Sequence, residues 1–106
     1  MKTSKNKMPI QMRGPLSFLI LWIVFKKSSR GCDIAVEIEK RKGSKPSPGT
    51  VYPLLKDLVS KGLLILSSNY SYKLTKKGEK EMISGCKKLS DIFYDFDEIK
   101  KIAKNN

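Results

Sequence analysis

The stretch SPGTVYPLLKDL, residues 47–58, decides the fold of this chain. Its apolar residues recur at helical spacing, and together with the next residue they form one face of a helical wheel: Val51, Leu54, Leu55, Leu58 and Val59. The opposite face is small or polar and consists of Gly49, Tyr52, Pro53, Lys56 and Ser60. The pattern predicts an amphipathic helix from about residue 48 to 61 that buries one face and leaves the other free for contacts.

Two prolines inside this stretch leave two possible starts for the helix. Ser47 can be the N-cap and Pro48 the first helical residue, in which case the helix bends at Pro53. Alternatively Thr50 is the N-cap, and Pro53 then stands in the first turn, where its missing N–H is not needed. Either start places the proline ring on the outer face. Open N–H groups at the start of such a helix suit contact with phosphates.

Two further helices are predicted before this one. Residues 15–27 begin with a proline and are apolar nearly all round, so we expect this helix to be covered on most sides, with Trp22 in the core. Residues 30–42 form the second helix, whose inward residues are Ile34, Ala35 and Ile38. Gly43 ends it, as glycine often does just after a helix.

A hairpin and a long helix are predicted after residue 62. Two short strands flank the polar pair Ser68-Asn69, which predicts a tight two-residue turn. Thr75 is a suitable N-cap for a last helix over about 76–103. Its apolar residues keep a spacing of three and four for six turns. This apolar surface is larger than the three short helices of the domain can cover, so we expect a second copy of the chain to cover it. The predicted dimer contacts are Met82, Cys86, Leu89, Phe93, Phe96 and Ile99. Phe93 and Phe96 have an alternative, packing onto Trp22 and Phe25 of their own chain.

The charge points to a polyanionic partner. The 106 residues include 22 Lys and Arg against 10 Asp and Glu, a net charge of +12. Residues 1–88 hold 19 basic and six acidic side chains, a net +13, whereas residues 89–106 are close to neutral. Nucleic acid is the first candidate partner and an anionic membrane the second. The ten apolar residues 16–25 are too few to span a bilayer, and the long apolar helix lacks a cationic polar face, so no membrane partner is expected.

The residue types argue against an enzyme or a metalloprotein. The chain has no histidine, and its two cysteines, Cys32 and Cys86, fit no metal or redox spacing. We expect both cysteines to be reduced and buried in a cytoplasmic protein without a metal or cofactor. No Gly-rich phosphate loop is present either, so we predict that the protein is not an enzyme.

The order helix, helix, helix, hairpin, helix is that of a winged helix-turn-helix, a mainly α fold with a small β-hairpin. The expected organisation is a flexible basic segment over 1–13, a DNA-binding domain over 14–75 and a dimerisation helix over 76–106. The run SPGTVYPLLKDLVSKGLL (47–64), followed by YSYKLTKKG (70–78), resembles the PadR-like transcriptional regulators, and RGCDIAVEI (30–38) resembles the segment that opens the family's second helix. The resemblance implies a homodimeric repressor that binds double-stranded DNA. Some members of the family bind drug-like molecules between subunits, but no effector can be named here.

Basic residues flank the predicted helix on both sides, in positions that suit phosphates next to a major groove. The predicted DNA contacts are Lys45, Ser47, Gly49, Thr50, Tyr52, Lys56, Lys73 and Lys77. Ser47 and Thr50 are also expected to cap the helix in the free protein. The alternative for Tyr52 is that its ring folds back on Val51 and the hairpin. The alternative function is a small basic RNA-binding or non-specific nucleic-acid-binding protein, although RNA binding favours aromatic side chains exposed on a sheet.

Overall fold

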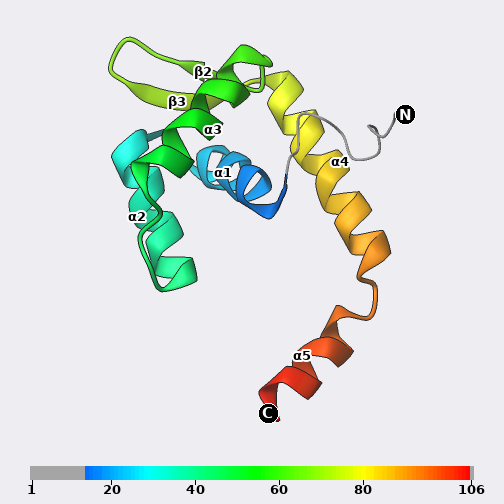
Figure 1. The fold of residues 1–106 in the computed structure, drawn as a ribbon. Helices are drawn as coiled ribbons and strands as arrows, with labels where there is room; N and C mark the ends of the chain where they lie inside the picture. The colour runs from blue at the N-terminus through cyan, green and yellow to red at the C-terminus, as the bar shows by residue number, and fades with distance from the viewer. Residues whose placement is uncertain (1–13, 106) are drawn as a thin grey trace, which may run out of the picture.

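The computed structural model describes residues 14–105, so the predicted basic segment 1–13 lies outside the described residues. Its elements follow one another as α1 Gly14–Lys26, β1 Ser29–Arg30, α2 Gly31–Lys42, α3 Pro48–Ser60, β2 Leu64–Leu66, β3 Ser71–Leu74, α4 Lys76–Ile92 and α5 Phe96–Lys104 (Figure 1). The winged helix-turn-helix class is confirmed. Within residues 14–105, no helix is both long enough and apolar enough to cross a membrane.

The inner face of α3 lies in the centre of the core. Val51, Leu55 and Leu58 are 1% exposed or less, while Leu54 and Val59 pack against the same cluster at its edge. The core residues of α2 are those predicted, Ile34, Ala35 and Ile38. From α1 come Ile20, Leu21, Ile23 and Val24. The predicted amphipathic face of α3 is therefore confirmed, and its burial leaves the opposite face outside.

The helix α3 starts at Pro48, with Ser47 in the N-cap position. The Ser47 carbonyl accepts from the N–H groups of Thr50 and Val51, at 2.9 and 3.2 Å. The first of the two predicted starts is thus correct, and Pro53 stands inside the helix. The Ser47 hydroxyl does not cap it, however, because it pairs with the Thr50 hydroxyl at 3.1 Å.

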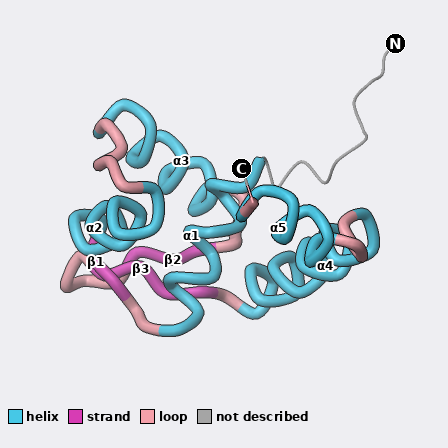
Figure 2. The backbone as a smooth tube through the Cα atoms, turned by 90° about the horizontal axis from the view of Figure 1, so that it is seen from below, coloured by secondary structure: helices cyan, strands magenta, loops and turns pink. Residues whose placement is uncertain are grey.

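The sheet has three strands rather than the two of the predicted hairpin. Their order is β1-β3-β2, all antiparallel, and Figure 2 shows them side by side. The additional strand β1, Ser29–Arg30, pairs with Tyr72 and Ser71. It was missed because two residues are too short to show an alternation of apolar and polar side chains.

The turn of the hairpin is one residue longer than predicted. The Ser67 N–H donates to the Ser71 carbonyl at 2.9 Å, so the loop comprises Ser68, Asn69 and Tyr70. Tyr70 takes the left-handed conformation, with φ at 66°, and its side chain is exposed. A turn followed by a left-handed residue is the usual build of a three-residue loop, although glycine normally fills that position. The prediction of Tyr70 as a strand residue is therefore wrong.

The start of α4 is tied to the end of α3 through one side chain. Thr75 is the N-cap, and its hydroxyl oxygen accepts from the Gly78 N–H at 2.9 Å, as predicted. The same hydroxyl donates to the Gly62 carbonyl at 2.6 Å. A Cβ on Gly78 would overlap the Leu63 carbonyl oxygen. The first turn of α4 therefore packs directly against the backbone that follows α3, with no room for a side chain at residue 78. This junction links α3, the hairpin and α4.

The C-terminal segment is two helices, and the prediction of a continuous helix over 76–103 is wrong. The helix α4 ends at Ile92, Phe93 leaves the helical region with φ −110° and ψ 45°, and α5 begins at Phe96. Residues 93–95 are two aromatics and an aspartate, which are weak helix formers. They are also exposed, so packing does not hold them straight. Figure 1 shows α5 turned away from the direction of α4 and standing clear of α1–α3.

Two predictions of burial are wrong. Trp22 is 37% exposed, because only the side of α1 around Ile20 and Val24 faces the core. Its ring stacks on Phe25 with 5.8 Å between centroids. Both cysteines are free, as expected, but both are exposed. Cys32 lies on the outer side of the first turn of α2, and Cys86 on the open surface of α4 beside Trp22.

The junction at Thr75 generates a stability prediction. We expect Thr75→Ala to lower the free energy of unfolding by about 1–2 kcal/mol, because it removes the helix cap and the bond to the Gly62 carbonyl. The matched control is Thr50→Ala, whose exposed hydroxyl meets only that of Ser47 and which should cost less than about 0.5 kcal/mol. Urea denaturation followed by circular dichroism measures both. Equal losses for the two variants would show that Thr75 does not hold the junction.

Candidate nucleic-acid interface

The outer face of α3 is solvent-exposed along its whole length. Gly49, Tyr52, Pro53, Lys56 and Ser60 are all exposed, as the wheel predicts. Thirteen residues make a helix about 20 Å long, which a major groove accommodates. This face is the centre of the candidate interface.

Tyr52 is the largest side chain on that face, and one edge of it is supported. Its ring lies against the backbone of Gly31, the first residue of α2. The side chain nevertheless remains 47% exposed. Tyr52 is therefore positioned by the protein and still open to a ligand.

The N-terminal end of α3 brings together four of the predicted residues. Ser47 and Thr50 share a hydrogen bond, Gly49 lies between them in sequence, and the exposed Lys45 precedes them by two residues. The first-turn N–H groups and the positive end of the helix dipole lie at the same place. Such an end attracts a phosphate.

The C-terminal end of α3 holds two lysines. Lys61 pairs with Asp57 at 2.8 Å and so neutralises an acidic side chain of α3. Lys77, from the first turn of α4, donates to the Lys61 carbonyl at 3.1 Å, where the helix dipole favours a cation. An ammonium has three N–H donors, so Lys77 can keep this bond and still meet a phosphate. The predicted Lys77 thus stands at the end of the recognition helix.

Lys73 was predicted as a DNA contact but is less favourably placed than expected, whereas Arg30 was not predicted but is well placed. Lys73 is exposed on β3, but its strand neighbours Tyr72 and Leu74 pack on the core, so Lys73 points to the other face of the sheet. It has the least direct access to the α3 side of the molecule. Arg30 was not predicted, yet it is exposed and directly precedes Gly31, the residue under the Tyr52 ring. Arg30 is far from α3 in the sequence and comes next to this helix only in the folded chain.

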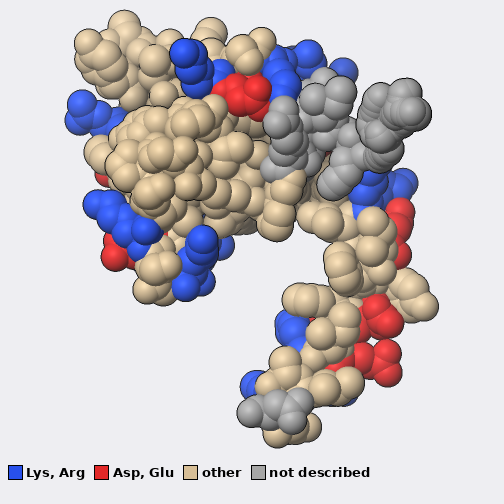
Figure 3. Space-filling model, in the orientation of Figure 1, with Lys and Arg blue, Asp and Glu red and all other residues tan. Residues whose placement is uncertain are grey.

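Basic side chains lie around the edges of the domain formed by α1–α3 and the sheet, with a few acidic side chains among them (Figure 3). Figure 3 shows Lys and Arg side chains spread over this domain, whereas on α5 basic and acidic side chains lie on opposite sides of the helix. The acidic members on α5 are Asp97 and Glu98. The candidate interface therefore lies on the winged helix and the first turn of α4, and not on α5.

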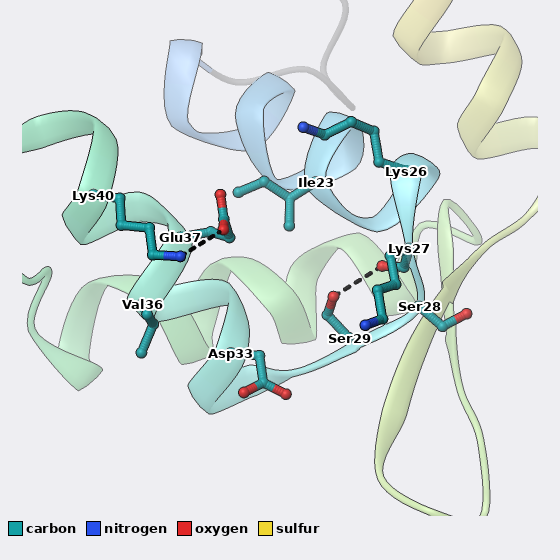
Figure 4. Close-up of a pocket in the computed structure, with 9 residues that line it drawn as sticks. All are labelled: Ile23, Lys26, Lys27, Ser28, Ser29, Asp33, Val36, Glu37 and Lys40. Carbon is teal, nitrogen blue, oxygen red and sulfur yellow. Dashed lines mark hydrogen bonds and ion pairs between the residues drawn. The ribbon is translucent and has the colours of Figure 1, made fainter.

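A surface hollow on the flank of α2 is chemically mixed. It lies between the end of α1 and the side of α2 that carries Asp33, Val36, Glu37 and Lys40 (Figure 4). Lys40 pairs with Glu37 at 3.4 Å, and the Ser29 hydroxyl donates to the Lys27 carbonyl at 2.8 Å. Two carboxylates lie among its three lysines, and Gly31, which meets α3, is on another side of α2. The hollow is not a continuation of the candidate interface.

An apolar groove runs between α1 and α4 on another surface. It is lined by Phe18, Trp22, Met82, Ile83, Cys86, Lys87, Ser90 and Asp91. Of the predicted dimer contacts, Met82 is buried in its own subunit, whereas Cys86 and Leu89 are exposed on α4. Phe93 pairs edge-on with Phe96 at 6.4 Å, and both remain half exposed, as does Ile99. Of these six residues, three lie on α4 and two on α5, while Phe93 stands in the break between the helices.

The fold and this surface define the class of protein: a winged helix-turn-helix protein whose third helix has an exposed outer face and lysines near both ends. Residues 20–84 match the model of the transcriptional regulator PadR-like family, which is more than half of the chain. The chain belongs to the PadR-like family of transcriptional regulators, which are DNA-binding proteins and not enzymes. A search of curated proteins found no significant match.

Solved structures agree with this assignment. The complex structure of hsRosR-S1, a RosR of H. salinarum, aligns with a TM-score of 0.70 and 25% identity over 88% of this chain and 90% of that one. The structure of smu.1704 from Streptococcus mutans aligns with a TM-score of 0.64 and 31% identity over 81% and 86%. A PadR family transcription regulator from Clostridium difficile gives 0.65 and 24% identity over 81% and 98%, which shows likeness in fold.

Proposed function

We propose that the protein is a homodimeric repressor that binds an inverted-repeat operator through α3, Pro48–Ser60, and works in the cytoplasm. The observation that carries the proposal is the one-sided burial of α3. Its inner residues are 1% exposed or less, while Gly49, Tyr52 and Lys56 face outward between basic ends. Repression is what the family resemblance implies, since a dimer on an operator excludes other proteins from that DNA.

In the proposed complex the contacts divide by type. Lys45, Lys56 and Lys77, with Ser47, Gly49 and Thr50 at the start of α3, bind phosphates and set the position of the helix. Tyr52 contacts base edges from the middle of α3. Arg30 extends the phosphate contacts beyond those predicted, and Lys73 is at most peripheral.

Dimerisation rests on the apolar surface that one subunit leaves open. Ile83 is 56% exposed and Leu89 41%, beside the groove that Trp22 lines. These residues, with Cys86 on the same helix, form a surface that the α4 helix of a second copy would cover, and α5 extends it with Phe96 and Ile99. An exposed apolar surface of this kind marks a protein–protein contact. Residues 76–106 would thus join two DNA-binding domains.

The decisive experiment is genome-wide binding followed by a salt titration on one recovered site. We expect inverted repeats whose half-site centres lie about one or two helical turns apart, because a two-fold dimer presents two α3 helices. A plot of the logarithm of the binding constant against the logarithm of the salt concentration should be a falling straight line. Its slope should be about −0.9 for each phosphate that the protein neutralises. Tighter binding to RNA than to the recovered duplex would favour the alternative function.

Lys56 provides a test of the phosphate contacts. Lys56→Ala should weaken binding to every duplex and reduce the salt slope by about 1.8, the value for the two phosphate contacts that a dimer with two α3 helices would lose. The matched control is Lys40→Ala, since Lys40 lies in the mixed hollow and is already paired with Glu37. Fluorescence anisotropy across a salt series measures both variants. Equal salt slopes for Lys56→Ala and the unchanged protein would remove Lys56 from the interface.

Leu89 tests the dimer. Leu89→Lys should give a monomer at micromolar concentration, because an ammonium would lie in the apolar contact, where burying an unpaired charge is costly. The control is Ser84→Lys, which adds the same charge on the opposite side of α4. Light scattering reports the mass of each. A monomeric mass for the unchanged protein would contradict the proposed dimer.

A further inference from the structure

The ring of Tyr52 lies where α2 has no side chain. A Cβ on residue 31 would be 2.7 Å from Cε1 of Tyr52, and 3.3 Å from both its Cζ and its hydroxyl oxygen. Carbon atoms not bonded to each other prefer about 3.5–4.0 Å, so a residue larger than glycine must displace the ring. Gly31 is itself buried, in contrast to Tyr52.

The contact is made by the outer end of the ring, the end that carries the hydroxyl. The inner end is fixed by α3, whose rotation is set by the buried face that includes Val51 and Leu55. The ring is therefore held at both ends, by the backbone of α3 and by the start of α2. A tyrosine has only two side-chain torsions, and this contact limits them on the side that faces α2. A side chain that is already ordered loses less entropy on binding.

From this geometry we infer that Gly31 positions Tyr52 for base recognition and so determines operator specificity without contacting DNA. The inference rests on the proposed function. The absent Cβ of residue 31 gives the hydroxyl and the free edge of the ring one location on the outer face of α3. A different location would leave the phosphate contacts in place but misalign the ring with the bases.

The surroundings of the ring allow a variant at residue 31 to fold. Tyr52 is half exposed, so a displaced ring has solvent to move into. Alanine is also a better helix former than glycine, which favours α2. Gly31→Ala is therefore expected to move the ring and not to unfold the domain.

The test is a double-mutant cycle of Gly31→Ala and Tyr52→Ala, read on two quantities. The first is the preference for a recovered operator over random duplex DNA. Gly31→Ala should reduce it about tenfold, within the range of one base contact, while affinity for random duplex and the salt slope stay unchanged. In the Tyr52→Ala protein, which has no ring to displace, Gly31→Ala should change the preference less than twofold. Cys32→Ala, the next residue of α2 and exposed, is the control and should behave as the unchanged protein.

The second quantity is the stability of the protein without DNA. It shows whether Gly31 and Tyr52 are in contact, independently of whether that contact affects operator preference. Gly31→Ala should raise the melting temperature more in the Tyr52→Ala protein than in the unchanged one, since only the latter must move a ring. If this coupling is present but Gly31→Ala keeps full operator preference, the positioning role is overturned and the proposed function stands. If Tyr52→Ala itself keeps operator preference, the inference about Gly31 fails. The salt slope of Lys56→Ala then decides separately whether α3 binds DNA. If the protein binds no duplex, the proposed function fails first.

A measurement on the unchanged protein decides the matter even if Gly31→Ala does not fold. In NMR spectra the Gly31 Hα protons should show cross-relaxation with the Tyr52 ring, both free and bound to the operator. Persistence of the contact in the complex supports the inference. Loss of the contact on operator binding, with Tyr52 turned away from Gly31, overturns it.

Discussion

Burial of the inner face of α3 is the constraint on which the rest of the interface depends. Val51, Leu55 and Leu58 lie in one core cluster with residues of α1, α2 and β2, and full burial of each stabilises the fold by about 1.5–3 kcal/mol. Since a helix repeats every 3.6 residues, this burial fixes the rotation of α3 about its axis. The direction in which Tyr52 and Lys56 point is therefore set by the core. The junction at Thr75 then ties the C-terminal end of the same helix to the hairpin and to α4.

The parts that could be predicted from the sequence are those with a local physical cause. The stripe of α3 follows from apolar spacing, and the end of α2 at Gly43 from a left-handed glycine with φ 87°. The cap at Thr75 was predictable because a threonine hydroxyl just before a helix can accept from an N–H of the first turn that has no partner within the helix. The outward placement of Tyr52 and Lys56 followed from the same wheel, so the centre of the candidate site was predictable as well.

The parts that were not predictable depend on contacts between distant segments. The support of Tyr52 by Gly31 joins residues 21 positions apart, and the approach of Lys77 to the Lys61 carbonyl needs the hairpin to fold back. Trp22 was expected in the core because α1 is apolar on all sides, and periodicity cannot choose a face for such a helix. The break after Ile92 was missed because apolar spacing continues through it, while weak helix formers without packing end the helix.

The central claim, that the outer face of α3 contacts DNA, is tested most directly by NMR titration of the labelled protein with a recovered operator duplex. The account predicts that the amide signals of residues 47–56 change most, together with that of Lys77, while those of residues 36–40 on the flank of α2 stay in place. The contrary result is saturable binding with unchanged signals over residues 47–56 and changes confined to α5 or to the hollow beside α2. That outcome would remove the recognition helix from the interface.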